Sequence, residues 1–468
     1  MSNQYLIRQE RPQVPPYEAA QMAQGLTEAL AQFLWPLLVC LDAVLDKRLV
    51  RTFVQTIAVI LTYRDRVNGL ILCELGGYLA SPDKAPAGTK RLSHLLHSVK
   101  WSSWLISRFL WQRASRQVEQ WAQAGEEALA IWDESVWEKP ESEQAEGLCA
   151  VRSSKAKRLT HYKKGYYSPP AKPICVPGLQ WLAVLVIGRS PKQGPPLLAA
   201  QRWWTSRGVH ASFKRDEEAK LLLDLAAQWQ RQVVHLFDQG YASSLWLKLL
   251  IGLKLRFIVR WRKQYHLLDA HGNKRPTWQL TRGKRGGPQR TLWDSRRTRW
   301  VQSSVLFQPV HHPDLPEASL TLVVCRSAGR LPWYLLTQEP VTCEEQAWCV
   351  VFAYMRSFQI EQTWRYEKSE LAFQSPRLWH WQQREKLLLM ASLAYAFLLS
   401  LLKPFSDPLR CWLVRHYDHR TGWHLRQAKA PLYRLRRALS RLWQQHPPDF
   451  AALGRPPVGT QVICIPLG

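Results

Sequence analysis

The sequence lacks the features that mark several protein classes. Its nine cysteines are scattered and odd in number, and none forms a Cys-x-x-Cys pair, so we expect a reducing, cytoplasmic protein without structural zinc. The chain begins with a polar run instead of an apolar core, so no signal peptide is expected. The uncharged run from Leu387 to Leu402 has sixteen residues, whereas a membrane-spanning helix needs about 20. We therefore predict a buried core helix there and no membrane partner.

Acidic residues are also scarce relative to basic ones. The 468 residues include 64 Lys and Arg against 36 Asp and Glu, which gives a net charge of +28 and a pI near 10.0. A positive field of this size favours a polyanionic partner, with nucleic acid as the default and an anionic membrane surface as the alternative. Many of the 24 tryptophans neighbour an Arg or Lys, as in Arg260-Trp-Arg262. Such pairs suit base stacking and phosphate contact, and equally suit a core over which Arg packs.

The pattern along the chain predicts an α/β protein with five regions. They are a helical, possibly DNA-binding region (1–125), the first part of an α/β core (126–263), a β-rich insertion (264–340), the second part of the core (341–405) and a basic C-terminal region (406–468). Within the first region, a helix from Thr89 followed by one carrying Arg108, Arg113 and Arg116 suits either a helix-turn-helix or a plain helical bundle.

Two aspartates stand at the ends of apolar, strand-like runs in the predicted core. Asp133 follows Leu129-Ala-Ile-Trp, and Asp238 follows Val233-Val-His-Leu-Phe. The order is a strand with Asp133, two hairpin strands, a helix, the strand with Asp238, a helix and a further strand, which indicates a mixed sheet. In such a sheet the first and fourth strands can be neighbours, and that would bring the two carboxylates together.

A third carboxylate lies on a helix near residue 360. Glu361, Arg365 and Lys368 fall at positions i, i+4 and i+7 and share one helix face. An ordinary helix with ion pairs has the same pattern. Combined with Asp133 and Asp238, however, Glu361 would complete a carboxylate set for two-metal phosphoryl chemistry. Thr342-Cys-Glu-Glu345 is predicted to cap the helix upstream of it.

The densest basic run lies between the first two strands. It contains Lys155, Lys157 and Arg158 among seven basic or His residues from Arg152 to Lys164. The run is predicted either to contact the phosphate backbone or to form a solvated loop. In the C-terminal region, Arg434, Arg436, Arg437 and Arg441 at helical spacing predict a DNA-contacting or solvated helix face.

These motifs resemble the DDE transposases of the insertion-sequence 4 family, in particular the branch with a β-rich insertion between its second Asp and its Glu. The segment Phe-Asp238-Gln-Gly-Tyr241 is similar to that family's D-x-G-Y motif, and Leu331-Pro-Trp-Tyr-Leu-Leu-Thr337 also precedes a helix. The run from Tyr354 through Glu361 to Lys368 is similar to its Y-(2)-R-(3)-E-(6)-K signature. The family's Arg is replaced by Ser357, and Arg356 stands one residue earlier. A local bend would let Arg356 take that place.

The resemblance implies an RNase H-like catalytic core and DNA strand transfer at transposon ends. It implies that Asp133, Asp238 and Glu361 are the catalytic metal ligands for two Mg²⁺ ions, with Mn²⁺ as a substitute. Tyr354, Arg356, Arg365 and Lys368 would then contact DNA. It further implies double-stranded DNA as partner, a homodimer on paired ends, and a prokaryotic, nucleoid-associated location. A DNA-binding relative without activity, a two-metal nuclease and a membrane-associated basic protein are the alternatives.

Overall fold

The computed structural model describes residues 15–62, 69–142, 144–154, 172–294, 299–403, 406–418 and 432–450. The chain forms two compact units that are both discontinuous in sequence. The first contains residues 1–110, 137–148 and 365–468, and the second contains residues 111–136 and 149–364. All three predicted catalytic carboxylates belong to the second unit.

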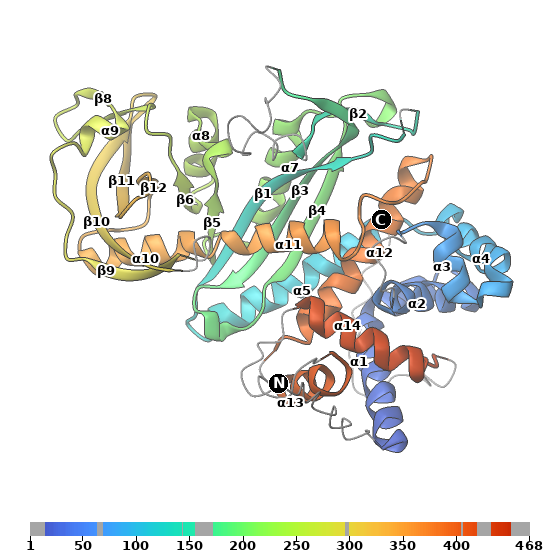
Figure 1. Cartoon of the computed structure of the whole chain (residues 1–468). Coiled ribbons are helices and arrows are strands. Elements are labelled where there is room, and N and C mark those ends of the chain that lie inside the picture. The colour runs from blue at the N-terminus through green and yellow to red at the C-terminus, as the bar shows by residue number, and fades with distance from the viewer. Residues whose placement is uncertain are drawn as a thin grey trace, which may run out of the picture. The chain divides into compact units, whose positions relative to one another are not determined.

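The second unit is built on a large mixed sheet (Figure 1). Its core strands are β1 (Ala128–Glu138), β2 (Cys149–Arg152), β3 (Cys175–Gly188), β4 (Leu197–Trp204), β5 (Val233–Phe237) and β6 (Arg256–Arg260). The order is β2-β3-β1-β5-β6, with β4 also paired to β3. β1, β5 and β6 are parallel, whereas β3 and β4 are antiparallel. The predicted adjacency of the first and fourth core strands is thereby confirmed, with Trp132 opposite Phe237.

One face of this sheet is covered by helices because the strands alternate apolar side chains toward it. Ala128, Ala130 and Trp132 of β1 share a buried cluster with Val233 and Phe237 of β5. The helices that contribute to the cluster are α5 (Trp104–Gln123), α7 (Lys214–Trp229) and α8 (Ser244–Gly252). Since neighbouring residues of a strand point to opposite faces, Asp133 and Asp238 project from the other face.

The predicted β-rich insertion continues the core sheet. Its strands are β7 (His266–Leu268), β8 (Lys274–Pro276), β9 (Arg290–Asp294), β10 (Arg299–His312), β11 (Leu315–Ser327) and β12 (Trp333–Thr337), with the short helix α9 (Thr277–Leu280). β12 pairs antiparallel with β6, and β10 and β11 form a long hairpin beside it. Helix α10 (Glu344–Met355) and helix α11 (Phe358–Ser369) then follow. α10 begins after Cys343, and the side chain of Gln346 accepts from Thr342 N, so the predicted capping box is wrong.

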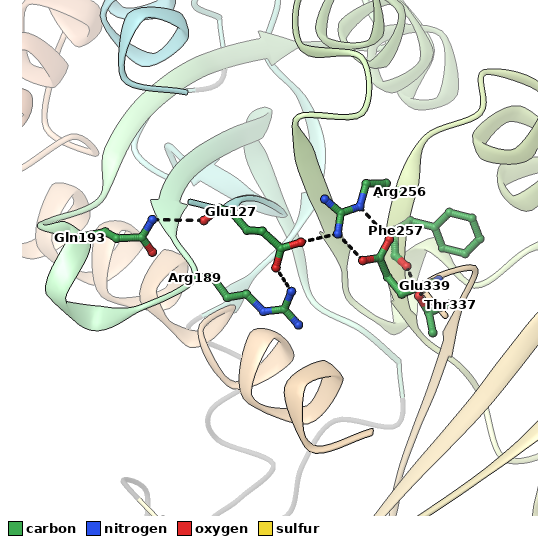
Figure 2. Close-up of polar contacts among 7 residues, drawn as sticks. All are labelled: Glu127, Arg189, Gln193, Arg256, Phe257, Thr337 and Glu339. Atoms are coloured by element: carbon green, nitrogen blue, oxygen red, sulfur yellow. Dashed lines mark hydrogen bonds and ion pairs between the residues drawn. The ribbon is translucent and has the colours of Figure 1, made fainter. Parts of the chain in front are cut away.

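An ion network joins four strand ends at the edge of the sheet where β1 and β6 begin (Figure 2). Arg256 pairs with both Glu127 and Glu339, and Arg189 pairs with Glu127. The carboxylates of Glu339 and Glu127 hold the pKa of Arg256 above its usual value against the opposing effect of burial. Because β1, β5 and β6 are parallel, this network lies at the opposite edge from Asp238.

The first unit is helical. Its helices are α1 (Pro16–Asp42), α2 (Lys47–Thr62), α3 (Leu72–Leu79), α4 (Ala85–His97), α12 (Trp381–Ser400), α13 (Asp407–Leu413) and α14 (Leu432–Gln445). α12 contains the predicted apolar run except for its last two residues, Leu401 and Leu402, and the run is almost entirely buried, as predicted. Arg437 and Arg441 of α14 pair with Asp418, and Arg436 is buried, so much of this basic face is engaged within the unit.

Among the described helices, α1 alone has the length and apolarity to cross a bilayer, with 44% of its most apolar window buried. A soluble core helix meets the same criterion.

Candidate active site

Asp133 and Asp238 lie side by side, at the same level along two adjacent parallel strands. The register pairs Trp132 with Phe237, so Asp133 and Asp238 are the next residues on the two strands. β5 ends at Phe237, and Asp238 caps the short helix that follows by accepting a hydrogen bond from Gly240 N. The strand end and this cap fix the backbone of Asp238, while its side chain remains exposed.

Helix α11 contacts the same face through Trp364. Its indole Nε1 donates to Asp133 Oδ2 at 2.8 Å, and its ring meets Trp181 of β3 edge to face with 4.4 Å between centroids. Glu361 precedes Trp364 by three residues and shares its side of the helix. The exposed Glu361 side chain therefore extends from the helical turn whose Trp364 binds Asp133.

Burial and a neighbouring charge act together on Asp133. The pKa of Asp133 is raised to about 7, mainly by burial and in part by the Asp238 carboxylate, while the Trp364 hydrogen bond opposes the shift. Two carboxylates on adjacent strands repel each other unless a proton or a cation lies between them. A bound cation would relieve this repulsion between the two carboxylates.

Tyr354 and Arg260 lie beside this pair. Burial raises the pKa of Tyr354 to about 12, and its hydroxyl interacts with Arg260 and with the charges of Asp238 and Asp133. Arg262, two residues beyond Arg260, donates to the Gln239 carbonyl at 3.5 Å. The sequence predicted Tyr354 as a site residue, whereas it indicated Arg260 only as one of several Trp-flanking arginines suited to phosphate contact. Its signal was present, because two arginines flank Trp261 where a core strand ends.

Arg356 lies at a break between two helices. α10 ends at Met355 and α11 begins at Phe358, with a turn at residues 356–357. A turn is therefore present at Arg356 and Ser357, and a DNA contact by Arg356 stays a prediction. Its Nε is buried and has no hydrogen-bond partner among the described residues, and burial lowers its pKa.

A second carboxyl pair lies on the helix-covered face. Glu134 pairs with Lys214 of α7 at 2.5 Å, and the fully buried Glu218 pairs with Arg215 at 2.8 Å. Burial and a hydrogen bond with Glu134 raise the pKa of Glu218 to about 8. Asp133 and Glu134 are adjacent in sequence but occupy different environments, because neighbouring strand residues point to opposite faces of the sheet.

The other predicted DNA contacts belong to the first unit or lie outside the described residues. Arg365 and Lys368 follow Glu361 on α11, but they belong to the first compact unit. Lys155, Lys157 and Arg158 lie outside the described residues.

Two carboxylates of the site, those of Asp133 and Asp238, have the chemistry to hold a hard cation. Among the described residues, no three Asp, Glu, His or Cys side chains are gathered closely enough to hold a metal ion. Mg²⁺, however, commonly takes only one or two protein carboxylates and completes its shell with water and substrate phosphate. Asp133 and Asp238 meet that requirement, and Glu361 as a third ligand stays a prediction.

Comparison with known proteins gives little further guidance. No protein-family model matches the sequence, and no curated protein matches it. Some solved structures do match. One is a piggyBac transposase in a synaptic complex with hairpin DNA, with 12% sequence identity and a TM-score of 0.39 over 93% of this chain and 81% of that one. Because a similarity of this extent assigns neither fold nor function, the function is inferred from the geometry of the site itself.

Proposed function

We propose that the protein is a DDE-type DNA transposase that cuts and joins the ends of an insertion sequence by metal-dependent phosphoryl transfer. The proposal includes an RNase H-like core and the insertion-sequence 4 resemblance. It also includes double-stranded DNA as substrate and target, a homodimer on paired ends, and a cytoplasmic, nucleoid-associated location.

The observation that carries the proposal is the pairing of Asp133 with Asp238. The two carboxylates occupy consecutive register positions after Trp132 and Phe237, and a hydrogen bond from Trp364 ties the glutamate helix to the first of them. Strands ordered β4-β3-β1-β5-β6, with α7 before β5 and α8 before β6, suit an RNase H-like core. The net charge of +28 suits a DNA substrate.

The side chains around the pair have complementary tasks. Asp133, Asp238 and Glu361 would hold Mg²⁺ or Mn²⁺, which when bound supplies activation of the attacking oxygen and stabilisation of the leaving 3′-oxygen. Arg260 and the half-buried Arg356 offer positive charge to the scissile phosphate. Tyr354, whose pKa of about 12 keeps it protonated, can donate a hydrogen bond to a phosphate oxygen. Phosphoryl transfer requires mainly such positioning and charge neutralisation from the protein.

One feature favours a second candidate function. Ser357 stands where the family resemblance expects an arginine, which suits a DNA-binding relative that has lost activity. A nuclease would cut without joining.

The test is cleavage of the DNA that flanks the gene, assayed with Mg²⁺ for the wild type, Asp238→Ala and a matched control, Asp216→Ala. Asp216 is exposed in the first turn of α7 and serves as a carboxylate away from the pair. Cleaved and joined products from the wild type and Asp216→Ala, and none from Asp238→Ala, are expected. Cleavage without joining would indicate a nuclease. DNA binding without cleavage by any variant would overturn the proposal in favour of the inactive relative.

A further inference from the structure

The first unit contains an open cavity that the proposed chemistry does not use. Its volume is about 370 Å³, within the lower range of small-ligand sites. The lining includes Trp137, Lys139, Glu141, Arg377, Trp379 and Arg384. These residues come from two segments, 137–145 and 376–384, which both belong to the first unit.

Two buried cations form the inner wall. Lys139 is 2% exposed and Arg384 is 1% exposed. Lys139 Nζ donates to the carbonyls of Gln374 and Ser375 at 3.1 and 3.3 Å and pairs with Glu141 at 2.6 Å. Charged side chains are rarely buried unless they are paired, so both positions require a specific explanation.

Arg384 is held by neutral groups. Its guanidinium donates to the carbonyls of Leu378 at 3.1 Å, Trp379 at 3.3 Å and Glu146. It lies 5.6 Å from the ring centre of Trp137 and 5.9 Å from that of Trp381, so two indoles cover it. Burial lowers its pKa to about 10 and the charge of the Glu146 carboxylate opposes that shift, but no carboxylate among the described residues forms an ion pair with it. The inner wall therefore keeps a positive charge that backbone dipoles neutralise only in part.

Among the described lining residues the one carboxylate, Glu141, is poorly buried. Glu141 is 51% exposed, so it can rotate into water and leave Lys139 to another anion. The rim carries the exposed Arg377 and an indole, Trp379, that is 56% exposed. Cations inside and an accessible aromatic ring at the mouth suit a ligand with a phosphate and a planar base.

We propose that this cavity binds a nucleoside monophosphate unit, with its phosphate between Lys139, Arg384 and Arg377 and its base against Trp379. Glu141 acts as an internal competitor that occupies Lys139 when the ligand is absent. The unit is either a free nucleotide or the terminal nucleotide of a DNA strand. The inference does not rest on the proposed transposase activity, because the cavity and the carboxylate pair belong to different units.

Because Glu141 competes with the ligand for Lys139, removing its charge should increase the affinity for the nucleotide. Full-length protein is titrated with deoxyadenosine 5′-monophosphate in a calorimeter, with adenosine and inorganic phosphate as partial ligands. Glu141→Gln removes the competing charge and should tighten binding by about five- to tenfold. Arg377→Gln and Trp379→Ala, both at exposed positions, should weaken it by at least about fivefold. Arg51→Gln, at an exposed site on α2, is the matched control and should change nothing.

Oligonucleotide competition identifies the source of the ligand. If a 5′-phosphorylated strand displaces the nucleotide at lower concentration than its 5′-hydroxyl counterpart, the ligand is a strand end. If neither strand competes, it is a free nucleotide, and both outcomes support the site. The inference is overturned if the nucleotide does not bind, or if Glu141→Gln and Arg377→Gln leave the affinity unchanged. It is also overturned if phosphate binds as tightly as the nucleotide. Asp238→Ala should bind normally, which separates this result from failure of the transposase proposal.

Discussion

The Trp364 indole carries the contact between the glutamate helix and Asp133. Trp364→Phe keeps an aromatic ring at the position that packs on Trp181 and removes the Nε1 donor together with part of the indole. We expect the rate of DNA cleavage at saturating substrate to fall by about tenfold, since one buried charge-assisted hydrogen bond contributes about 1.5–3 kcal/mol. DNA affinity should be unchanged, because the indole would position Asp133 and does not supply charge for DNA.

A matched substitution distinguishes this effect from a general loss of packing. Trp348→Phe removes an indole that donates to Glu344 at 3.0 Å on α10. Its cleavage rate should stay near that of the wild type. Equal losses in the two variants would contradict the positioning role of Trp364.

His235 makes stability depend on pH. It is fully buried in β5 and accepts a hydrogen bond from Trp132 Nε1 at 3.1 Å, and burial lowers its pKa to about 3. Because the folded pKa lies below the usual 6.5, the neutral form stabilises the fold above pH 6.5. That contribution is lost as the pH falls toward 3. Between pH 6.5 and 4.5 we expect about 2 kcal/mol of it to disappear.

Urea unfolding at several pH values measures this change. In His235→Gln, which retains an acceptor for Trp132, the free energy of unfolding should fall less over the same interval. An identical pH dependence in the two proteins would show that His235 is not the titrating group.

At the scale of elements, the ion network at the start of β1 and β6 is expected to stabilise the sheet. Arg256→Met leaves Glu127 and Glu339 without their shared partner, and the three side chains are 19%, 36% and 13% exposed. We expect a loss of about 2 kcal/mol in the free energy of unfolding, less than for a fully buried pair. The control is Arg202→Met, which breaks a more exposed pair with Asp224 and should cost under about 1 kcal/mol. Similar losses in both variants would contradict a structural role for the network.

The local sequence pattern predicted a core element correctly where an apolar run ends abruptly at a polar residue. The strand Val233–Phe237 has the predicted bounds, because a continuous apolar run ends abruptly at Asp238. Pairing of β1 with β5 followed from the order of elements alone. The site could be predicted to the extent that its carboxylates sit at such strand ends.

Longer-range features could not be predicted in this way. The insertion looked like an interruption of the core, yet β12 pairs with β6, about 75 residues apart in sequence, and no local pattern encodes that partner. The roles of Trp364 and Arg260 likewise depend on contacts across the sheet. The start of α10 at Glu344 shows a related limit. The Thr342 hydroxyl donates a hydrogen bond to the Gln346 side chain and does not cap the helix, and the helix begins one residue later than predicted.

At the scale of the whole molecule, the excess of positive charge predicts a steep salt dependence of DNA binding. A protein that neutralises six to ten phosphates loses on the order of 10³- to 10⁵-fold in affinity between about 50 and 200 mM salt, through counterion release. We expect this protein to fall in that range when affinity is measured on duplex DNA across the two conditions. A change of less than about tenfold would indicate that the charge serves a different partner.

The central claim is that Asp238, beside Asp133, holds a divalent metal ion during DNA cleavage, and a metal-specificity switch tests it most directly. Asp238→Cys replaces a carboxylate oxygen with a sulfur, which binds Mn²⁺ better than Mg²⁺ because Mg²⁺ strongly prefers oxygen ligands. End cleavage would be compared for the wild type, Asp238→Cys and Asp238→Ala with each ion. We expect Asp238→Cys to be inactive with Mg²⁺ and to regain cleavage with Mn²⁺, while Asp238→Ala stays inactive with both. Activity of Asp238→Ala with Mg²⁺ would contradict the claim.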